Sequence, residues 1–436
     1  MMAAVAVDAA ICEERGFAVC SGAKPMHRIA PEAREHAQAQ PRQDEAAAPA
    51  RKPIAAAGRI DYIDAVRVLL IMLVVAHHSV EAYVTAHPPE IPLPDPPLAQ
   101  GSVFLWVNAA FFMGLFFFLA GYFTSTAFDR KGAAAFLADR GLRLGVPLAL
   151  GTVAIVPLAG WAHVALDPAL PRIGYWTYLT QDFFGHGARP AFWPAGERWP
   201  QLNFGHLWFI EHLLVYALLY AALRAVLPRD RGSAGRSPPS HGAIFAYAVL
   251  LSAATFAVRI DYPQNRWVAF LGFIQMEPAH LPQYASLFAI GVFAGPRRWI
   301  ETMPTRRGLV WLAVGAGLAF TAYLRAATGA AASGGTSGWR ICTAESFLCV
   351  GLCVGLPVLA RELALGAGRL WRALAANVFA VYVFHMPIVL FLQWALIDAP
   401  APKLLRLFVT VFAAIIGSFA FTHWVILRLP YARRIF

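Results

Sequence analysis

The feature that most constrains this chain is a succession of about ten apolar runs, joined by mostly short polar segments. About 20 consecutive apolar residues allow an α-helix to cross the hydrocarbon core of a bilayer. Backbone polar groups in lipid need partners within the segment, which a helix provides. The sequence therefore predicts an all-α, polytopic membrane protein with about ten transmembrane helices. The runs occupy residues 62–84, 103–127, 142–166, 205–227, 243–260, 280–296, 308–326, 341–360, 374–397 and 404–427.

The composition supports this class of protein. Hydrophobic residues make up 58% of the chain and charged residues 14%, whereas a soluble domain is nearer half apolar and a quarter charged. The net charge of +11 does not predict a nucleic-acid partner, because the Lys and Arg residues lie in short segments beside the apolar runs. The cysteines show no metal-binding spacing, and we expect no metal.

The segments outside the runs predict the domain organisation and the orientation. Residues 1–58 are rich in Ala, Pro, Gln and charge, which is typical of a disordered tail. The membrane domain is predicted at 59–428, followed by a basic end at 429–436. If the N-terminus is cytoplasmic, the cytoplasmic loops hold twice as many Lys and Arg residues as the opposite loops. We therefore expect both termini to be cytoplasmic, in a plasma membrane or bacterial inner membrane.

Ionisable side chains inside the runs are the candidate functional residues, because they are costly in a membrane and usually mark a site or a pair. They are Asp64, Arg67, His77, His78 and Glu81 in the first run, His206, Glu211 and His212 in the fourth, Glu345 in the eighth and His385 in the ninth.

Arg67 and His78 are eleven positions apart, so a helix places them on one face with about 16 Å between them along the axis. His77 points about 100° away from His78. A histidine titrates near neutral pH and suits general-base work on an alcohol. An arginine binds phosphates through its planar fork. The pair suggests a site with an anionic donor on one side and an acceptor on the other. Alternatively, Arg67 reaches the lipid headgroups and the histidines bond to neighbouring helices.

The long segment 167–204 is rich in aromatic residues, among them Trp176, Trp193 and Trp199. Aromatic side chains at a membrane surface often form an anchoring belt. They also form stacking platforms for sugar rings. Both interpretations stay open for this segment.

Five segments resemble, in the same order, motifs of the acyltransferase-3 family of integral membrane O-acyltransferases. In that family the first helix carries an arginine, ten residues and then a histidine, which Arg67 and His78 match and His77 does not. Ala120 stands where the family usually has Ser. The chain looks like the branch that contains glucan biosynthesis protein C, a succinyl transferase. The segments are DYIDAVRVLLIMLVVAHHS (61–79), FFFLAGYF (116–123), DRGLRLGVPL (139–148), FGHLWFIEHLLVY (204–216) and VYVFHMPIVL (381–390).

The resemblance implies transfer of an acetyl or succinyl group from cytoplasmic acyl-CoA to a hydroxyl of a carbohydrate or other acceptor, on or across the membrane. It implies that His78 is the general base or acyl relay and that Arg67 orients the donor. Arg140 and Arg143 are expected to hold phosphates of CoA, or only to anchor the chain at the cytoplasmic face. Candidate substrate-binding residues are Asp64, Glu81, His206, Trp208, Glu211 and His385.

A secondary transporter or exporter of a small polar solute is the alternative, because it also carries buried ionisable residues. Transporters often consist of two similar halves. Residues 60–230 and 240–428 show no convincing similarity, and the D-x-x-R pattern of the first run occurs once. This favours an enzyme, with membrane lipids and a hydroxyl-bearing acceptor as its partners and no nucleic acid.

Overall fold

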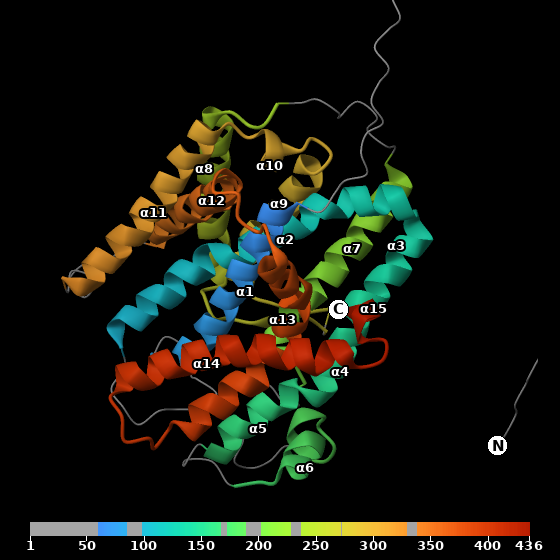
Figure 1. The fold of residues 1–436 in the computed structure, drawn as a ribbon, viewed down its shortest axis with the longest axis vertical. Coiled ribbons are helices and arrows are strands. Elements are labelled where there is room, and N and C mark those ends of the chain that lie inside the picture. The colour runs from blue at the N-terminus through green and yellow to red at the C-terminus, as the bar shows by residue number, and fades with distance from the viewer. Residues whose placement is uncertain are drawn as a thin grey trace, which may run out of the picture. The chain divides into compact units, whose positions relative to one another are not determined.

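A computed structural model describes residues 60–84, 98–166, 172–188, 202–227, 237–271, 273–328 and 338–436. The predicted tail at 1–58 lies outside these residues. The described part is helical apart from one antiparallel hairpin, β1 (Val268–Phe270) and β2 (Ile274–Met276), in which Val268 pairs with Met276 (Figure 1). The prediction of an all-α, polytopic membrane protein is confirmed.

Nine helical segments within the described ranges are long and apolar enough to cross a membrane, and they match nine of the ten predicted runs. The third is a continuous stretch of shorter elements, α3 (Ala133–Arg140), a π-helical turn at Gly141–Gly145, α4 (Val146–Ala154) and α5 (Val156–Leu166). The others are α1 (Asp61–Glu81), α2 (Ala99–Lys131), α7 (Trp208–Val226), α8 (His241–Asp261), α11 (Thr305–Ala327), α12 (Gly338–Glu362), α13 (Arg369–Ala395) and α14 (Lys403–Trp424).

The remaining predicted run, 280–296, forms the shorter helix α9 (Leu281–Ala294). Its length of about 21 Å is less than the ~30 Å of a bilayer core. A side chain built at Gly121 of α2 would place Cβ 2.1 Å from the carbonyl oxygen of Phe288 in α9, and one at Gly291 would meet Phe118 at 2.2 Å. The two glycines therefore let the backbones of α2 and α9 touch.

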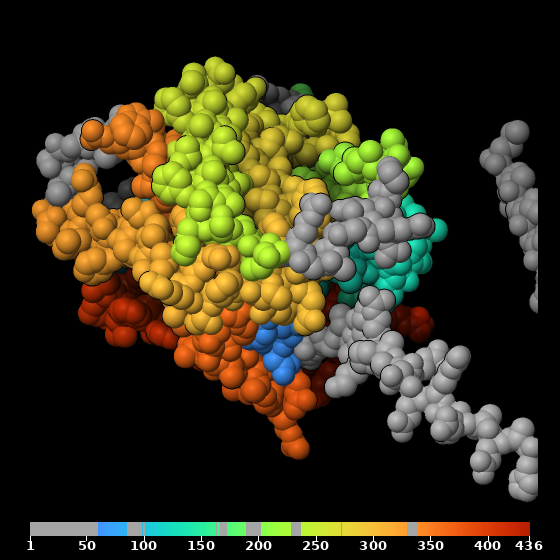
Figure 2. All heavy atoms as spheres, turned by 90° about the horizontal axis from the view of Figure 1, so that it is seen from above, coloured from blue at the N-terminus to red at the C-terminus, as the bar shows by residue number. Residues whose placement is uncertain are grey.

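Helix α1 lies in the interior of the helical region. Figure 1 shows it, in blue, among the other helices, and it packs against α2, α12, α13 and α14. Of its apolar window 61% is buried, against 22% for α8 and 11% for α11. Side chains of α8 and α11 cover much of the face in Figure 2, and many of them are exposed and apolar, as expected of a surface in contact with lipid. The helix with the most ionisable residues is thus among the best shielded.

Candidate functional site: a histidine cluster beside an arginine-lined cavity

His78 lies in the last turn of α1 and shares a carboxylate with its neighbour. Its Nδ1 is 2.8 Å from Oε2 of Glu81, and Nε2 of His77 is 3.4 Å from Oε1 of the same side chain. Spacings of three and four residues bring the side chains together on a helix. An ionised carboxylate only accepts hydrogen bonds, so Nδ1 of His78 donates to Glu81, and in the neutral ring Nε2 is then the acceptor nitrogen.

Two further histidines continue from His78, each on a different helix. The ring of His385 in α13 lies with its centroid 5.3 Å from that of His78, and the ring of His206 lies 5.2 Å from that of His385. His206 belongs to the short 3-10 turn Gly205–Leu207 that begins α7. We call His78, His385 and His206 the histidine row. Residues more than a hundred positions apart in the sequence therefore form one row.

Hydrogen bonds to the backbone fix the rings of His206 and His385. Nε2 of His206 is 3.1 Å from the carbonyl oxygen of Val383, and Nδ1 of His385 is 2.8 Å from that of Tyr382. Both nitrogens donate, because a carbonyl only accepts. Nε2 of His385 is buried and has no hydrogen-bond partner among the described residues. Buried polar atoms normally have partners, so this acceptor is open to a water molecule or a ligand.

A cavity of about 400 Å³ lies on the Arg67 side of the histidine row and contains all three arginines predicted to bind the donor. Arg67 reaches it from α1, Arg140 from the end of α3 and Arg143 from the π-helical turn. The remaining lining is mostly apolar, and Ala120, at the position where the family usually has Ser, is part of it. We call it the arginine cavity.

Tyr382 connects the arginine cavity to the histidine row. It lines the cavity, its hydroxyl donates to the backbone carbonyl of His206, and its ring centroid lies 6.3 Å from that of His385. Phe436 of the predicted basic end also lines the cavity, so this end packs against the membrane domain.

Acidic residues balance the cations of the arginine cavity only in part. Nη1 of Arg67 lies 3.2 Å from Oδ1 of Asp64. Nε of Arg143 lies 3.4 Å from Oδ1 of Asp139, and Nζ of Lys131 lies 2.7 Å from the same oxygen. The side chains of Arg67 and Arg143 are 38% and 48% exposed, which leaves both accessible to an anion.

The other predicted substrate-binding residues lie in different places. Asp64 is the partner of Arg67 and lies about 20 Å along the helix from the histidines. Trp208 stacks on Tyr284, with ring centroids 5.4 Å apart. Glu211 accepts a hydrogen bond of 3.0 Å from the backbone of Gln275 in β2. The geometry places Glu81, His206 and His385 at His78, and it places Trp208 and Glu211 under the hairpin.

Glu345, the ionisable residue predicted in the eighth run, forms a closed ion pair. Both of its oxygens accept from Arg259 of α8, at 2.6 and 2.7 Å. Its side chain is 3% exposed. Such a bidentate pair satisfies the carboxylate, and Glu345 has a structural partner that the sequence did not reveal.

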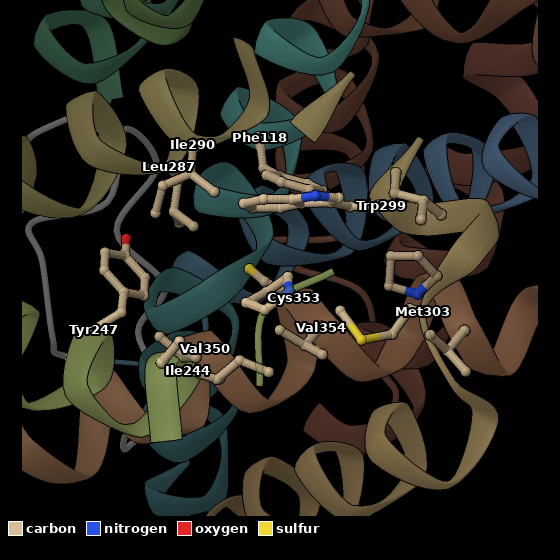
Figure 3. A pocket seen from close by; sticks show the side chains of 15 residues that line it. Phe118, Ile244, Tyr247, Leu287, Ile290, Trp299, Met303, Val350, Cys353 and Val354 are labelled. Atoms are coloured by element: carbon tan, nitrogen blue, oxygen red, sulfur yellow. The ribbon is translucent and has the colours of Figure 1, made fainter. Parts of the chain in front are cut away.

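A second cavity, of about 270 Å³, is lined by residues such as Phe118, Tyr247, Trp299 and Cys353 (Figure 3). The described residues that line it include no Asp, Glu, Lys, Arg or His. It therefore offers no carboxylate, imidazole or cation to a ligand. Likewise, no cluster of three His, Cys, Asp or Glu side chains suited to hold a metal ion occurs in the described part of the chain.

The comparison with protein families gives one result. The model of the acyltransferase-3 family, described as an acyltransferase domain, matches residues 60–423. No curated protein and no solved structure matches the chain. The family match covers α1 to α14 and therefore every residue of the histidine row and every arginine of the arginine cavity.

Proposed function

Because this chain belongs to the acyltransferase-3 family and is a membrane acyltransferase, we propose that it transfers an acyl group from acyl-CoA to a hydroxyl beside His78. One observation carries the proposal: the arginine cavity and the histidine row meet at Tyr382. This arrangement supports a polyanionic donor bound next to the proposed general base. We expect the enzyme in a plasma membrane or bacterial inner membrane, with the arginine cavity open to the cytoplasm.

The arginine cavity suits acyl-CoA in charge and in shape. Arg67, Arg140 and Arg143 provide planar cations that bind phosphate oxygens in pairs. The apolar lining suits the thin pantetheine arm, and a volume of about 400 Å³ lies in the usual range for ligand pockets. Acetyl-CoA and succinyl-CoA are the two donors that we propose.

His78 is the proposed general base. Its Nε2 takes the proton of the acceptor hydroxyl while the oxygen attacks the thioester carbonyl carbon. A carbon–oxygen bond forms, the carbon–sulfur bond breaks, and the proton passes from Nε2 to the sulfur of CoA. The products are an ester and free CoA. The step requires no group other than the donor, the hydroxyl and the histidine.

Glu81 is the proposed positioning residue for this base. Its contact of 2.8 Å with Nδ1 of His78 fixes the tautomer that presents Nε2 to the substrate. It also stabilises the imidazolium that forms during the transfer, as the carboxylate does in a Ser-His-Asp triad. This proposed role differs from the predicted one, in which Glu81 contacts the substrate.

A transporter remains a weaker explanation of the same residues. The pair Arg259–Glu345 accounts for two charges within the helical region without a transported solute. The acyltransfer reaction accounts for the histidine row and the arginines together.

Labelled acyl-CoA provides the test. Membranes or reconstituted protein are incubated with labelled acetyl-CoA or succinyl-CoA, and both CoA release and labelled acceptor are measured. We expect the wild-type protein to release CoA and to form labelled ester that mild alkali cleaves. Absence of CoA release with both donors, from protein that remains folded, would overturn the proposal.

A further inference from the structure

A third cavity lies at the histidine end of α1, beside the hairpin β1–β2. It measures about 430 Å³. Gly205, which lines it, directly precedes His206 of the histidine row. The cavity therefore borders the short turn that carries His206. Its lining residues are Asn203, Gly205, Trp267, Val268, Ala269 and Gln275.

Trp267 gives this cavity an accessible aromatic wall. The residue is 49% exposed, and its ring meets that of Trp208 edge to face, with centroids 5.8 Å apart. Trp208 thereby fixes the orientation of the Trp267 ring. The side-chain amides of Asn203 and Gln275 lie on the same cavity wall. Both also bond to the backbone of 202–205, and an amide, with two N–H donors and two acceptor sites, can bond to the protein and to a ligand at once.

The hairpin is tied firmly to the start of α7. The side chain of Gln275 accepts from the backbone of Phe204 at 3.1 Å and donates to the carbonyl of Leu202 at 3.1 Å. Its backbone donates to Glu211 at 3.0 Å. These three bonds hold the cavity wall in register with His206, so a ligand bound there has a fixed position relative to the histidine row.

We propose that this cavity, the hairpin pocket, binds a ring of a carbohydrate acceptor by stacking on Trp267. This inference rests on the proposed function. A sugar ring combines a flat C–H face with hydroxyls around its edge, and the pocket offers an indole face beside two amides. Pockets with an aromatic wall and a few fixed polar groups are typical of small-ligand sites. The docked ring presents a hydroxyl of its own or of its neighbour toward the histidine row.

The experiment compares Trp267→Ala with Trp424→Ala in membranes supplied with labelled acetyl-CoA. Trp424 is 60% exposed at the end of α14, lines neither the hairpin pocket nor the arginine cavity, and is a matched control for loss of an exposed tryptophan. Label in the carbohydrate fraction reports transfer. Slow hydrolysis of acyl-CoA by purified protein, in which water takes the acyl group in place of the acceptor and CoA is released, reports donor use. We expect Trp267→Ala to lose about tenfold in transfer, with CoA release unchanged, and Trp267→Phe to restore most of it.

Each of the other outcomes contradicts either the hairpin pocket or the proposed function. Equal transfer by the Trp267→Ala and Trp424→Ala variants overturns the hairpin pocket, and so does label that enters only lipid or protein. A parallel loss of transfer and acceptor-independent CoA release assigns Trp267 a structural role and also overturns it. If the wild-type protein releases no CoA from any donor, the proposed function fails first.

Discussion

Two buried polar groups of this molecule differ in whether their hydrogen-bonding capacity is used up. Arg259 and Glu345 satisfy each other through two bonds of 2.6 and 2.7 Å. In the histidine row, by contrast, Nε2 of His385 has no hydrogen-bond partner among the described residues, and His78 remains 23% exposed. The comparison shows that a buried charge alone does not mark a site. We therefore assign the candidate site to the histidine row, where an acceptor is left open beside a cavity.

The largest expected effect is the loss of activity on removing the base. His78→Ala should lower acyl transfer by about 10²- to 10⁴-fold, the usual contribution of general acid–base catalysis, while thermal stability changes little. Transfer of label from acyl-CoA and a melting curve in detergent measure the two. If folded His78→Ala protein transfers acyl groups as fast as wild type, His78 is not the base and the histidine row has no role in the reaction.

The ion pair should give the opposite pattern. Glu345→Ala leaves Arg259 buried without its carboxylate, and breaking such a pair costs about 3–5 kcal/mol of stability. We expect a lower melting temperature and lower yield, and near wild-type transfer per folded molecule. A stable Glu345→Ala protein without activity would contradict the distinction between the two groups.

The carboxylate at His78 should have an intermediate effect on catalysis. Glu81→Gln keeps the shape of the side chain but removes the charge that stabilises the imidazolium, and we expect kcat to fall by about 10- to 100-fold. The KM for acyl-CoA should stay the same, because Glu81 lies at the histidine end of α1. A change confined to KM would indicate direct substrate contact instead.

The arginine cavity should act on donor binding. Arg67→Ala should raise the KM for acyl-CoA about tenfold with a smaller change in kcat, because it removes a charge-assisted hydrogen bond to a phosphate. Arg428→Ala, at an exposed residue that does not line the cavity, is the control and should behave like wild type. Equal donor dependence in both variants would assign Arg67 to anchoring at the headgroups.

Local spacing predicted much of this arrangement. Nine of the predicted apolar runs form long helices, and helical geometry predicted that Arg67 and His78 share one face. The same geometry contains the contact between His78 and Glu81, three residues apart. The spacing of three residues thus predicts the contact, although the sequence analysis assigned Glu81 to substrate binding.

Contacts between distant segments were beyond prediction from a single sequence. Nothing local indicates that His206 and His385 meet, since their contact depends on how α7 and α13 pack. Glu345 is a candidate functional residue by sequence, and only the packing of α8 against α12 shows that Arg259 is its partner. The hairpin pocket and its Trp267 were not predicted, because the short strands beside this residue lie between two long apolar runs and carry no motif.

The smallest expected effect separates the two adjacent histidines. His77 is 8% exposed, its ring packs near Phe112 with centroids 5.1 Å apart, and its Nε2 shares Glu81 with His78. His77→Ala should therefore loosen the carboxylate without removing the base, and transfer should fall by less than about tenfold, well below the loss from a missing general base. His77→Gln, which keeps a hydrogen-bond donor, should recover part of this loss. A loss as large as that of His78→Ala would mean that the two histidines act as one unit, and that the match of His78 to the family's spacing does not distinguish them.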